Sequence, residues 1–226
     1  MIAVVTGAGR GIGRAIAREL SRRGCDVALL SRSEASLTAL AAELSADGKR
    51  ALAVPCDVSR ERDVADAKAH VLSELGVPRV VVCNAGIVHR ATVGETSLEA
   101  WRETLDVNLT GTFLTVRAFL PEMRAAKVGR FVAIASISAT LGSPRHAAYA
   151  ASKWGQVGFI KSLAEELRGS GLTAMSVLPG SVDTDMLVGS GFEPAMTPDD
   201  VARTVAFVAL DAPDAMNASA TEIFGP

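Results

Sequence analysis

Thr6-Gly7-Ala8-Gly9-Arg10-Gly11-Ile12-Gly13 follows the apolar run at residues 2–6 and opens a segment of helical period at residues 11–23. Glycines let the backbone turn tightly and approach a ligand closely, and the N-terminus of the following helix offers free N–H groups and a dipole that favours negative charge. A strand, such a loop and a helix in immediate succession predict a site for the pyrophosphate of a dinucleotide. A tight turn that binds no ligand is the alternative interpretation.

Short apolar runs alternate with helical patterns along most of the chain. Nearly continuous β-rich hydrophobicity is typical of strands that are covered on both faces. The predicted strands are residues 2–6, 26–30, 51–54, 80–83, 131–135 and 174–178, with 220–224 as a short candidate for a seventh. Segments of helical period lie near residues 11–23, 34–46, 60–75, 99–126, 147–168 and 198–210. This alternation predicts an α/β fold with a doubly wound, Rossmann-type and mostly parallel sheet of six or seven strands and helices on both faces.

The composition indicates an ordinary globular protein of one domain over residues 1–226. Of the 226 residues, 49% are hydrophobic and 21% are charged, so the chain can bury a full core. A formal net charge of −2 and a pI of about 6.0 offer no broad basic surface, which argues against nucleic acid or a membrane as a partner. No apolar run has the length of a membrane span and the start lacks the basic residues of a signal peptide, so we expect a cytoplasmic protein.

The three cysteines, Cys25, Cys56 and Cys83, are odd in number, widely spaced and set in or beside apolar segments. This pattern predicts buried free thiols in a reducing compartment. No spacing of cysteine and histidine is typical of a zinc site, and we expect no metal.

Tyr149 and Lys153 are separated by three small residues. On a helix, the two side chains project from one face about one turn, roughly 5.4 Å, apart. An ammonium beside a phenol favours the ionised phenol, and a lowered pKa suits the phenol to general acid–base catalysis. Ser136 stands thirteen residues before Tyr149 at the end of a predicted strand, where parallel sheets contact ligands, so its hydroxyl can hold a substrate oxygen. A surface Tyr–Lys pair is the alternative interpretation.

The glycine spacing differs from that of many dinucleotide folds. Gly7, Gly11 and Gly13 follow the pattern T-G-x-x-x-G-x-G rather than G-x-G-x-x-G, because an isoleucine stands between the last two. Together with Tyr149 and Lys153, this pattern resembles the short-chain dehydrogenase/reductase family, most closely its NADPH-dependent ketone or 3-oxoacyl-thioester reductases. The resemblance implies an oxidoreductase that transfers a hydride between NADP(H) and a small-molecule carbonyl compound or secondary alcohol.

The matching motifs run from residue 6 to residue 184, and the resemblance implies a role for each catalytic candidate. Ser136 and Tyr149 would hold the carbonyl oxygen, and Tyr149 would be the general acid or base. Lys153 would lower the pKa of the phenol and orient the ribose, and Asn108 would support Lys153 through a bound water. The catalytic candidates are therefore Asn108, Ser136, Tyr149 and Lys153.

The end of the second predicted strand favours NADPH over NADH. Ser31-Arg32-Ser33 carries no carboxylate for a ribose 2′-hydroxyl, and Glu34 is better placed in the first turn of the next helix. Arg32, together with Arg10, could instead hold a 2′-phosphate through charge-assisted hydrogen bonds, although two solvated surface arginines are the alternative. The cofactor-binding residues that the loop and the resemblance imply are Gly7, Arg10, Gly11, Ile12, Gly13, Arg32, Asp57, Val58, Asn84, Ala85, Gly86, Tyr149, Lys153, Val182 and Thr184.

The motif after the fourth predicted strand departs slightly from the family. The usual Asn-Asn-Ala-Gly reads Cys83-Asn84-Ala85-Gly86 here, which puts in doubt a structural hydrogen bond beneath the active site. The change affects no catalytic group.

Substrate choice is expected to lie in residues 185–198. This segment is short and has few large apolar groups, which predicts a small lid and an open site. His146, three residues before Tyr149, is more typical of a solvated helix cap than of a substrate contact. His70 and His89 lie near no motif and are expected on the surface.

Small and apolar residues on more than one face of two long helices predict self-association, and the resemblance implies a homo-oligomer, either dimer or tetramer. The helices are those at 99–126 and 147–168, and the small residues include Ala147, Ala151, Gly155 and Gly158.

Two other functions fit a sheet of this kind. A cofactor-binding sensor or scaffold would have a silent site, and a methyltransferase would use the same sheet for another ligand. A methyltransferase has no need of the Ser, Tyr and Lys set, and a silent relative is expected to have lost one of its members. The reductase is therefore favoured.

Overall fold

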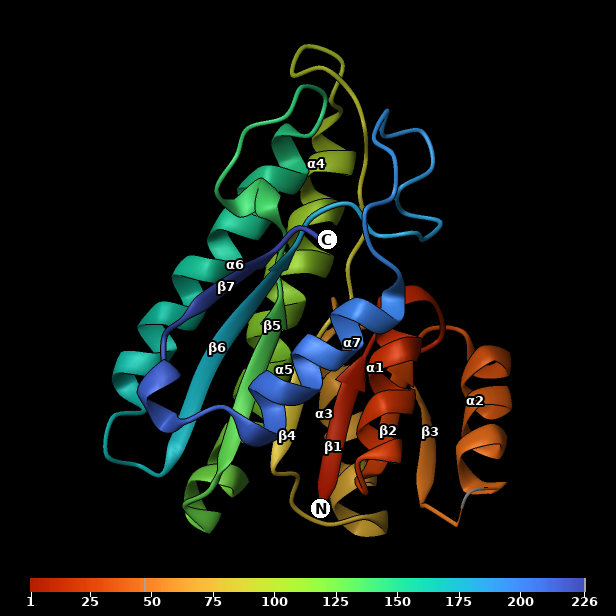
Figure 1. The fold of residues 1–226 in the computed structure, drawn as a ribbon, viewed down its shortest axis with the longest axis vertical. Coiled ribbons are helices and arrows are strands. Elements are labelled where there is room, and N and C mark those ends of the chain that lie inside the picture. The colour runs from red at the N-terminus through yellow and green to blue at the C-terminus, as the bar shows by residue number, and fades with distance from the viewer. Residues whose placement is uncertain (47, 226) are drawn as a thin grey trace.

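A parallel sheet forms the centre of the molecule, for which a computed structural model describes residues 1–46 and 48–225. Seven strands lie in the order β3-β2-β1-β4-β5-β6-β7, and all neighbouring pairs are parallel (Figure 1). The strands are β1 (Ile2–Thr6), β2 (Asp26–Ser31), β3 (Ala51–Pro55), β4 (Val80–Cys83), β5 (Gly129–Ile134), β6 (Leu172–Pro179) and β7 (Ala220–Ile223). The α-helices are α1 (Gly11–Arg22), α2 (Glu34–Ala46), α3 (Glu61–Glu74), α4 (Leu98–Leu105), α5 (Gly111–Ala126), α6 (Ala147–Glu166) and α7 (Pro198–Ala206).

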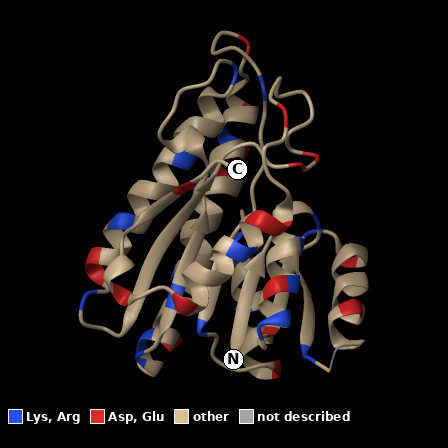
Figure 2. Cartoon of the chain, in the orientation of Figure 1, with Lys and Arg blue, Asp and Glu red and all other residues tan. Residues whose placement is uncertain are grey.

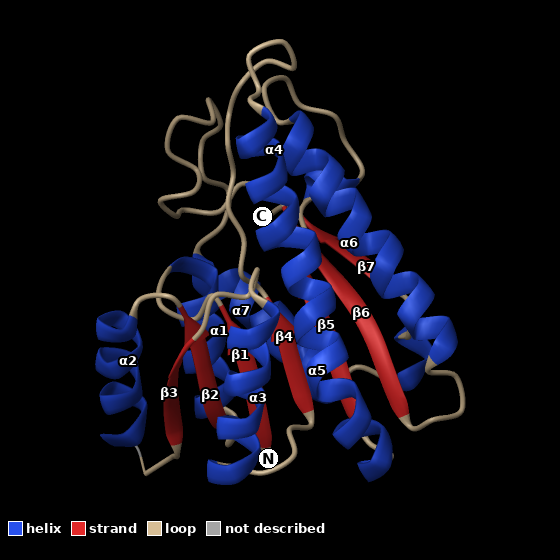
Figure 3. Ribbon diagram, turned by 180° about the vertical axis from the view of Figure 1, so that it is seen from behind, coloured by secondary structure: helices blue, strands red, loops and turns tan. Residues whose placement is uncertain are grey.

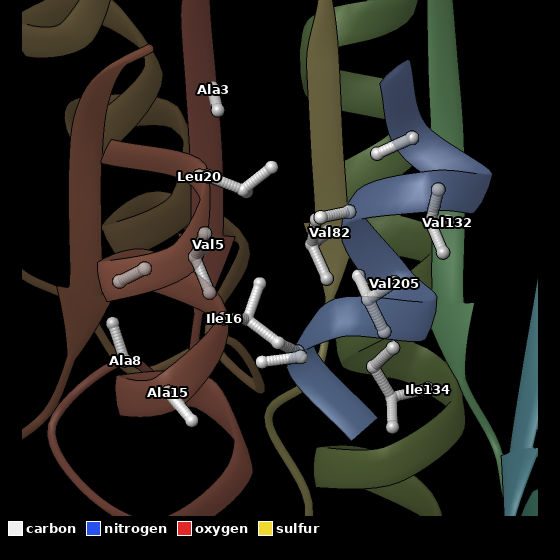
Figure 4. Packing of buried hydrophobic residues seen from close by; sticks show 14 of the residues in the cluster. Ala3, Val5, Ala8, Ala15, Ile16, Leu20, Val82, Val132, Ile134 and Val205 are labelled. Carbon is white, nitrogen blue, oxygen red and sulfur yellow. The ribbon is translucent and has the colours of Figure 1, made fainter. Parts of the chain in front are cut away.

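Helices cover both faces of the sheet, as the continuous hydrophobicity of its strands predicts. Successive side chains of a strand point to opposite faces of the sheet. A strand that is apolar at every position therefore needs helices packed on both faces. In β1, Ala3 and Val5 lie in the core beneath α1, α2 and α7, whereas Val4 lies in the core beneath α3, α5 and α6. Figure 4 shows Ile16 of α1 and Val205 of α7 over the first face, and Figure 3 shows α3, α5 and α6 over the second.

Charged side chains are almost confined to the helices and loops (Figure 2). The seven strands carry only Asp26, Arg130 and Glu222, each near the end or the edge of the sheet. All three cysteines are buried and free of disulfides, as predicted. Within the described residues, no helix is long and apolar enough to cross a membrane.

The structure confirms the six predicted strands and the candidate seventh, with small shifts at their ends. β5 begins two residues earlier than predicted and β6 extends to Pro179. Glu34 lies in the first turn of α2, where a carboxylate suits the helix dipole.

The prediction of one uninterrupted helix over residues 99–126 is wrong in one respect. A π-helical turn, Asp106–Thr110, separates α4 from α5, and a second, Phe207–Asp211, follows α7. Such a turn holds one extra residue, and single π turns inside helices are frequent at functional sites. A hydrophobic pattern averaged over several turns does not reveal one extra residue.

The functional edge of the sheet is fixed by its strand order. β1 lies at the centre of the sheet, paired with β2 on one side and with β4 on the other. From β1 the chain adds β2 and β3 outward on the first side, and then crosses over to add β4 to β7 outward on the second. In open α/β sheets, ligands bind outside the carboxyl ends of the strands at such a switch point. The loops that follow β1 and β4 meet there.

Candidate active site

The loops after β1 and β4 are joined by Thr6 and Asn84. The Thr6 hydroxyl accepts hydrogen bonds from the backbone N–H groups of Asn84 and Ala85, at 3.0 and 3.1 Å. The Asn84 amide donates to the carbonyl oxygens of Thr6 and Gly7, at 3.0 and 3.3 Å. These bonds hold the glycine loop against the switch point. Sequence reasoning gave Thr6 no role, although a hydroxyl residue between an apolar strand and a glycine loop is the available signal.

Gly7 and Gly13 are glycines because the loop passes close to neighbouring backbone. Gly7 has a φ of +67°, and a Cβ there would lie 2.9 Å from the Cα of Ala85. A Cβ on Gly13 would lie 2.2 Å from the Gly7 carbonyl oxygen. The first turn of α1 therefore packs directly on the loop, and its residues Gly11, Ile12 and Gly13 line the cavity beyond it. Arg10, the residue before α1, makes no capping hydrogen bond to that end of the helix.

A cavity of about 540 Å³ lies along this edge of the sheet, within the range of small-molecule sites. It brings together fourteen of the fifteen predicted cofactor-binding residues: Gly7, Arg10, Gly11, Ile12, Gly13, Arg32, Asp57, Val58, Asn84, Ala85, Gly86, Tyr149, Lys153 and Thr184. Val182, the fifteenth, lines an adjoining cavity. The Ser31 hydroxyl is buried without a partner among the described residues and borders the larger cavity at the end of β2. Glycine backbone, the N-terminus of α1 and an unpaired hydroxyl beside Arg32 together fit a phosphorylated dinucleotide.

Charges at the far end of this cavity are both basic and acidic. Arg32 is exposed, and its positive charge, together with that of Arg60, lowers the pKa of Asp57. Burial opposes the effect, but hydrogen bonds from Ser59 and these two guanidinium groups hold the pKa of Asp57 below its ordinary value. Arg10 forms an ion pair with Asp185 at 2.9 Å, and both side chains are 77% exposed, so this is a surface ion pair.

Tyr149 and Lys153 lie one turn apart near the start of α6, where the cavity meets the sheet. The Lys153 Nζ is 5.6 Å from the centre of the Tyr149 ring and donates a hydrogen bond of 2.9 Å to the Ile134 carbonyl oxygen at the end of β5. Lys153 is 3% exposed, so its ammonium is removed from water with one protein partner. Ser136, two residues beyond β5, is also buried and faces the Tyr149 phenol.

The pKa directions at this site differ from those the sequence predicts. Burial raises the pKa of Tyr149, and the Ser136 hydrogen bond and the charge of Arg90 offset the rise only in part. Burial also lowers the pKa of Lys153 to about 7. The sequence led us to expect that Lys153 lowers the phenol pKa, whereas burial in this structure disfavours the charged form of both groups.

Asn108 lies on the first π turn and is fully buried beneath the cavity. Its Oδ1 accepts from the Ile87 N–H at 2.8 Å, and its Nδ2 donates to the Ile87 carbonyl and the Ser152 hydroxyl, at 3.0 and 2.9 Å. Ser152 in turn donates to the Tyr149 carbonyl at 2.7 Å. Asn108 thus ties the loop after β4 to the turn of α6 that carries Tyr149. A Cβ on Gly86 would lie only 3.3 Å from the Asn108 Oδ1, so a glycine at this position lets the loop after β4 pack closely against Asn108.

A second cavity, of about 150 Å³, adjoins the first on the far side of Tyr149. Both cavities are lined by Ile12, Tyr149, Thr184 and Met186, among others, and Ser136 lines only the second. Three large apolar groups from the segment after β6 line the second cavity: Met186, Leu187 and Phe192.

His146 also lines the second cavity, and the prediction of a solvated helix cap is wrong. It is 8% exposed, and its ring lies edge-on to Tyr149 with the ring centres 6.3 Å apart. Arg90, which sequence reasoning did not identify, donates to the His146 Nε2 at 3.2 Å. No local sequence signal marks Arg90, because three separate loops bring it there. His70 is exposed and His89 pairs with Glu103 at 2.7 Å near the surface, as predicted.

Cys83, in place of the family's first Asn, ends β4 inside the core beneath α3, α5 and α6. Burial raises the pKa of its thiol to about 12, so the group stays protonated. In the part of the chain that the structure describes, its side chain makes no hydrogen bond, and the contacts beneath the site come from Thr6, Asn84 and Asn108.

Comparisons with known proteins agree on the family. The model of the short chain dehydrogenase family matches residues 1–191. A 3-oxoacyl-[acyl-carrier-protein] reductase from Synechocystis is 36% identical over 220 residues, covering 93% of this chain and 89% of the relative. The crystal structure of a 3-ketoacyl-ACP reductase from Sinorhizobium meliloti has a TM-score of 0.93 at 30% identity, covering 100% of this chain and 98% of that one. An alcohol dehydrogenase from the archaeon Thermococcus sibiricus, complexed with 5-hydroxy-NADP, has a TM-score of 0.88 at 31% identity, covering 99% and 94%.

Proposed function

The chain belongs to the short-chain dehydrogenase family, and on this premise we propose that it transfers a hydride between NADP(H) and a carbonyl compound or secondary alcohol, with Tyr149 as the general acid or base. One observation supports this proposal above the others. Tyr149 borders both cavities, so a substrate in the smaller cavity and a dinucleotide in the larger would meet at its hydroxyl. A silent sensor would not need this arrangement.

The catalytic steps follow from the groups around the smaller cavity. Ser136 and Tyr149 donate hydrogen bonds to the substrate carbonyl oxygen and polarise the carbonyl. NADPH, when bound, supplies the hydride that reduces the carbon. Tyr149 then gives its proton to the developing alkoxide, a transfer that the raised pKa of the phenol does not hinder in the direction of reduction. Reduction is therefore the favoured direction.

Lys153 and Asn108 support Tyr149 in this proposal. Lys153 lies close enough to the phenol for its charge to stabilise the tyrosinate after proton transfer, and it lines the larger cavity, where it would hold the ribose of the dinucleotide. Asn108 holds the turn of α6 that carries Tyr149, through Ser152. Its Oδ1 accepts one hydrogen bond, from the Ile87 N–H, and the second lone pair of the amide oxygen would accept from a water that passes a proton towards Lys153.

We expect NADPH rather than NADH as the cofactor. Arg32 and the unpaired Ser31 hydroxyl border the cavity at the end of β2, and no carboxylate lies at that strand end to receive a ribose 2′-hydroxyl. The archaeal relative was solved with an NADP derivative, which agrees with this expectation.

We also propose a homo-oligomer that assembles through α4, α5 and α6. Three large apolar side chains on these helices are exposed: Leu98 at 60%, Phe113 at 39% and Trp154 at 55%. A Cβ on Gly158 of α6 would meet nothing within 4 Å, so the space outside this glycine is open. Gly155 is explained within the chain, because Leu109 packs against it.

An absorbance assay of NADPH and NADH oxidation with ketones, diketones, oxo acids and acyl thioesters tests the proposal. We expect reduction of at least one of these carbonyl classes, with NADPH strongly preferred. Arg32→Gln should lower kcat/KM for NADPH roughly tenfold, the value of a charge-assisted contact to phosphate, and leave that for NADH unchanged. Arg62→Gln, on an arginine that is 92% exposed on α3, is the matched control and should change neither.

Two results would contradict this assignment. Equal rates with NADH and NADPH in the unchanged protein would overturn the role of Arg32. No oxidation of either nucleotide with any carbonyl class would overturn the reductase itself.

A further inference from the structure

The second cavity is lined by one side chain with a fixed charge. Within the described residues, the lining contains no Asp, Glu or Lys, and Arg90 is its only Arg. The other lining groups are apolar, hydroxyl-bearing or backbone, apart from His146. A single guanidinium in a small site beside the catalytic phenol is a strong electrostatic feature, because a charge is attracted more strongly where water is scarce.

Hydrogen bonds to neighbouring groups orient the His146 ring and assign its tautomer. Its Nδ1 lies 2.8 Å from the Pro144 carbonyl oxygen, which can only accept, so Nδ1 carries the proton. Its Nε2 lies 3.2 Å from the Arg90 Nε, which can only donate, so Nε2 accepts. His146 therefore orients the guanidinium without neutralising its charge.

Arg90 is held by three loops and its charge has no acidic partner. Its Nη2 donates to the Met186 carbonyl oxygen, which belongs to the segment after β6. The Ala91 N–H donates to the Arg145 carbonyl at 3.2 Å, where the chain adopts a φ of +64° just before His146. None of the ion pairs in the described part of the chain includes Arg90. Both side-chain bonds go to neutral acceptors, so most of its five N–H donors remain available.

We propose that Arg90, oriented by His146 and Met186, binds a carboxylate of the substrate, so that the carbonyl compound reduced at Tyr149 is a short-chain oxo acid. This inference rests on the proposed function. A planar guanidinium matches a carboxylate with two parallel hydrogen bonds, and one positive charge balances one negative charge. A cavity of about 150 Å³ is smaller than the usual range of small-molecule sites, which suits a short acid.

Binding measurements in the presence of NADP⁺ test the site without turnover, because the oxidised cofactor cannot reduce an oxo acid. We would titrate the NADP⁺-loaded protein by calorimetry with 3-oxobutanoate and with its methyl ester, which keeps the ketone and removes the charge. The acid should bind at least tenfold more tightly. Arg90→Gln should raise the Kd of the acid by about 10- to 100-fold and change that of the ester by less than about twofold.

Matched variants distinguish an Arg90 that binds a carboxylate from an Arg90 that only holds the surrounding loops together. Arg90→Lys keeps the charge but loses the paired geometry, so we expect an intermediate Kd for the acid and unchanged circular dichroism. Arg62→Gln removes one charge far from the cavity and should leave both Kd values unchanged. With NADPH, kcat/KM should follow the same order, and KM should change more than kcat.

Three outcomes would overturn the proposal: equal affinity for acid and ester, an equal loss of both in Arg90→Gln, or tighter binding of dihydroxyacetone phosphate than of the acid. The second outcome would mean that Arg90 only holds the loops. Selective binding of the acid through Arg90 without NADPH oxidation would instead contradict the proposed function and leave the carboxylate site standing.

Discussion

Lys153 shows how one residue can be costly to the fold and useful to the site. Its amine is buried on α6 with one hydrogen bond, to the Ile134 carbonyl, and its pKa is lowered from 10.5 to about 7. Below about pH 7 the folded chain must bury an ammonium, whereas near pH 10 it buries a neutral amine. The unfolded chain binds more protons between these pH values, so the contribution of Lys153 to stability rises with pH across that window.

Lys153→Met should therefore stabilise the ligand-free protein in a pH-dependent way. The gain in the free energy of unfolding over the unchanged protein should be larger at pH 7 than at pH 9.5 by about 3 kcal/mol. Urea unfolding followed by circular dichroism at these two pH values measures the difference. Lys161→Met, at an exposed position of the same helix, is the matched control and should show no such change with pH.

A gain that is equal at both pH values would contradict this prediction, because it would mean that Lys153 keeps an ordinary pKa in the folded chain. The bound cofactor must be absent, since its charges would act on the same amine.

At the residue scale, spacing in the sequence identified the residues that share an element or follow a strand. Tyr149 and Lys153 are one helical turn apart on α6, and Ser136 follows β5, so local rules place them. Arg90 and His146 meet only because loops after β4 and before α6 fold onto each other. No local pattern carries that information.

Helices α4, α5 and α6 carry the exposed apolar side chains that the proposed oligomer needs. We expect sedimentation at micromolar concentration to show dimers or tetramers. Trp154→Glu places a charge on α6 at a side chain that is 55% exposed, and should shift the population towards monomer. Val77→Glu is the control, because Val77 is 39% exposed but lies just before β4, outside α4, α5 and α6. This variant should leave the population of dimers or tetramers unchanged.

Only monomer in the unchanged protein would contradict the oligomer. A shift towards monomer in both variants would show that added negative charge, rather than loss of the apolar contact, separates the subunits.

At the element scale, hydrophobic period predicted which segments are helices and strands but not where helices change their winding. The π turn at Asp106–Thr110 places Asn108 under the site, and its signal in the sequence is one extra residue in a long amphipathic pattern. Lid segments are harder still to predict. The segment after β6 has no regular period, so the positions of Met186 and Phe192 over the smaller cavity depend on packing against other loops.

At the scale of the whole molecule, strand order brings distant segments to one edge. The larger cavity is lined mostly by the loops after β1, β2, β3 and β4, with residues of α6 and of the segment after β6, and the smaller mostly by the segments after β4, β5 and β6. Alternating strands and helices predicted this parallel sheet, because right-handed crossovers leave few arrangements. The two cavities themselves were not predictable, since their walls are side chains from loops that the sequence does not place.

The central claim is that Tyr149, at the junction of the two cavities, is the acid that completes reduction. The most direct test is Tyr149→Phe, which removes only the hydroxyl, assayed for carbonyl reduction with NADPH and for NADPH binding by fluorescence. We predict a fall in kcat of at least about 100-fold, the usual range for loss of a general acid, and a Kd for NADPH within about threefold of the unchanged protein. Undiminished turnover in this variant would contradict the account.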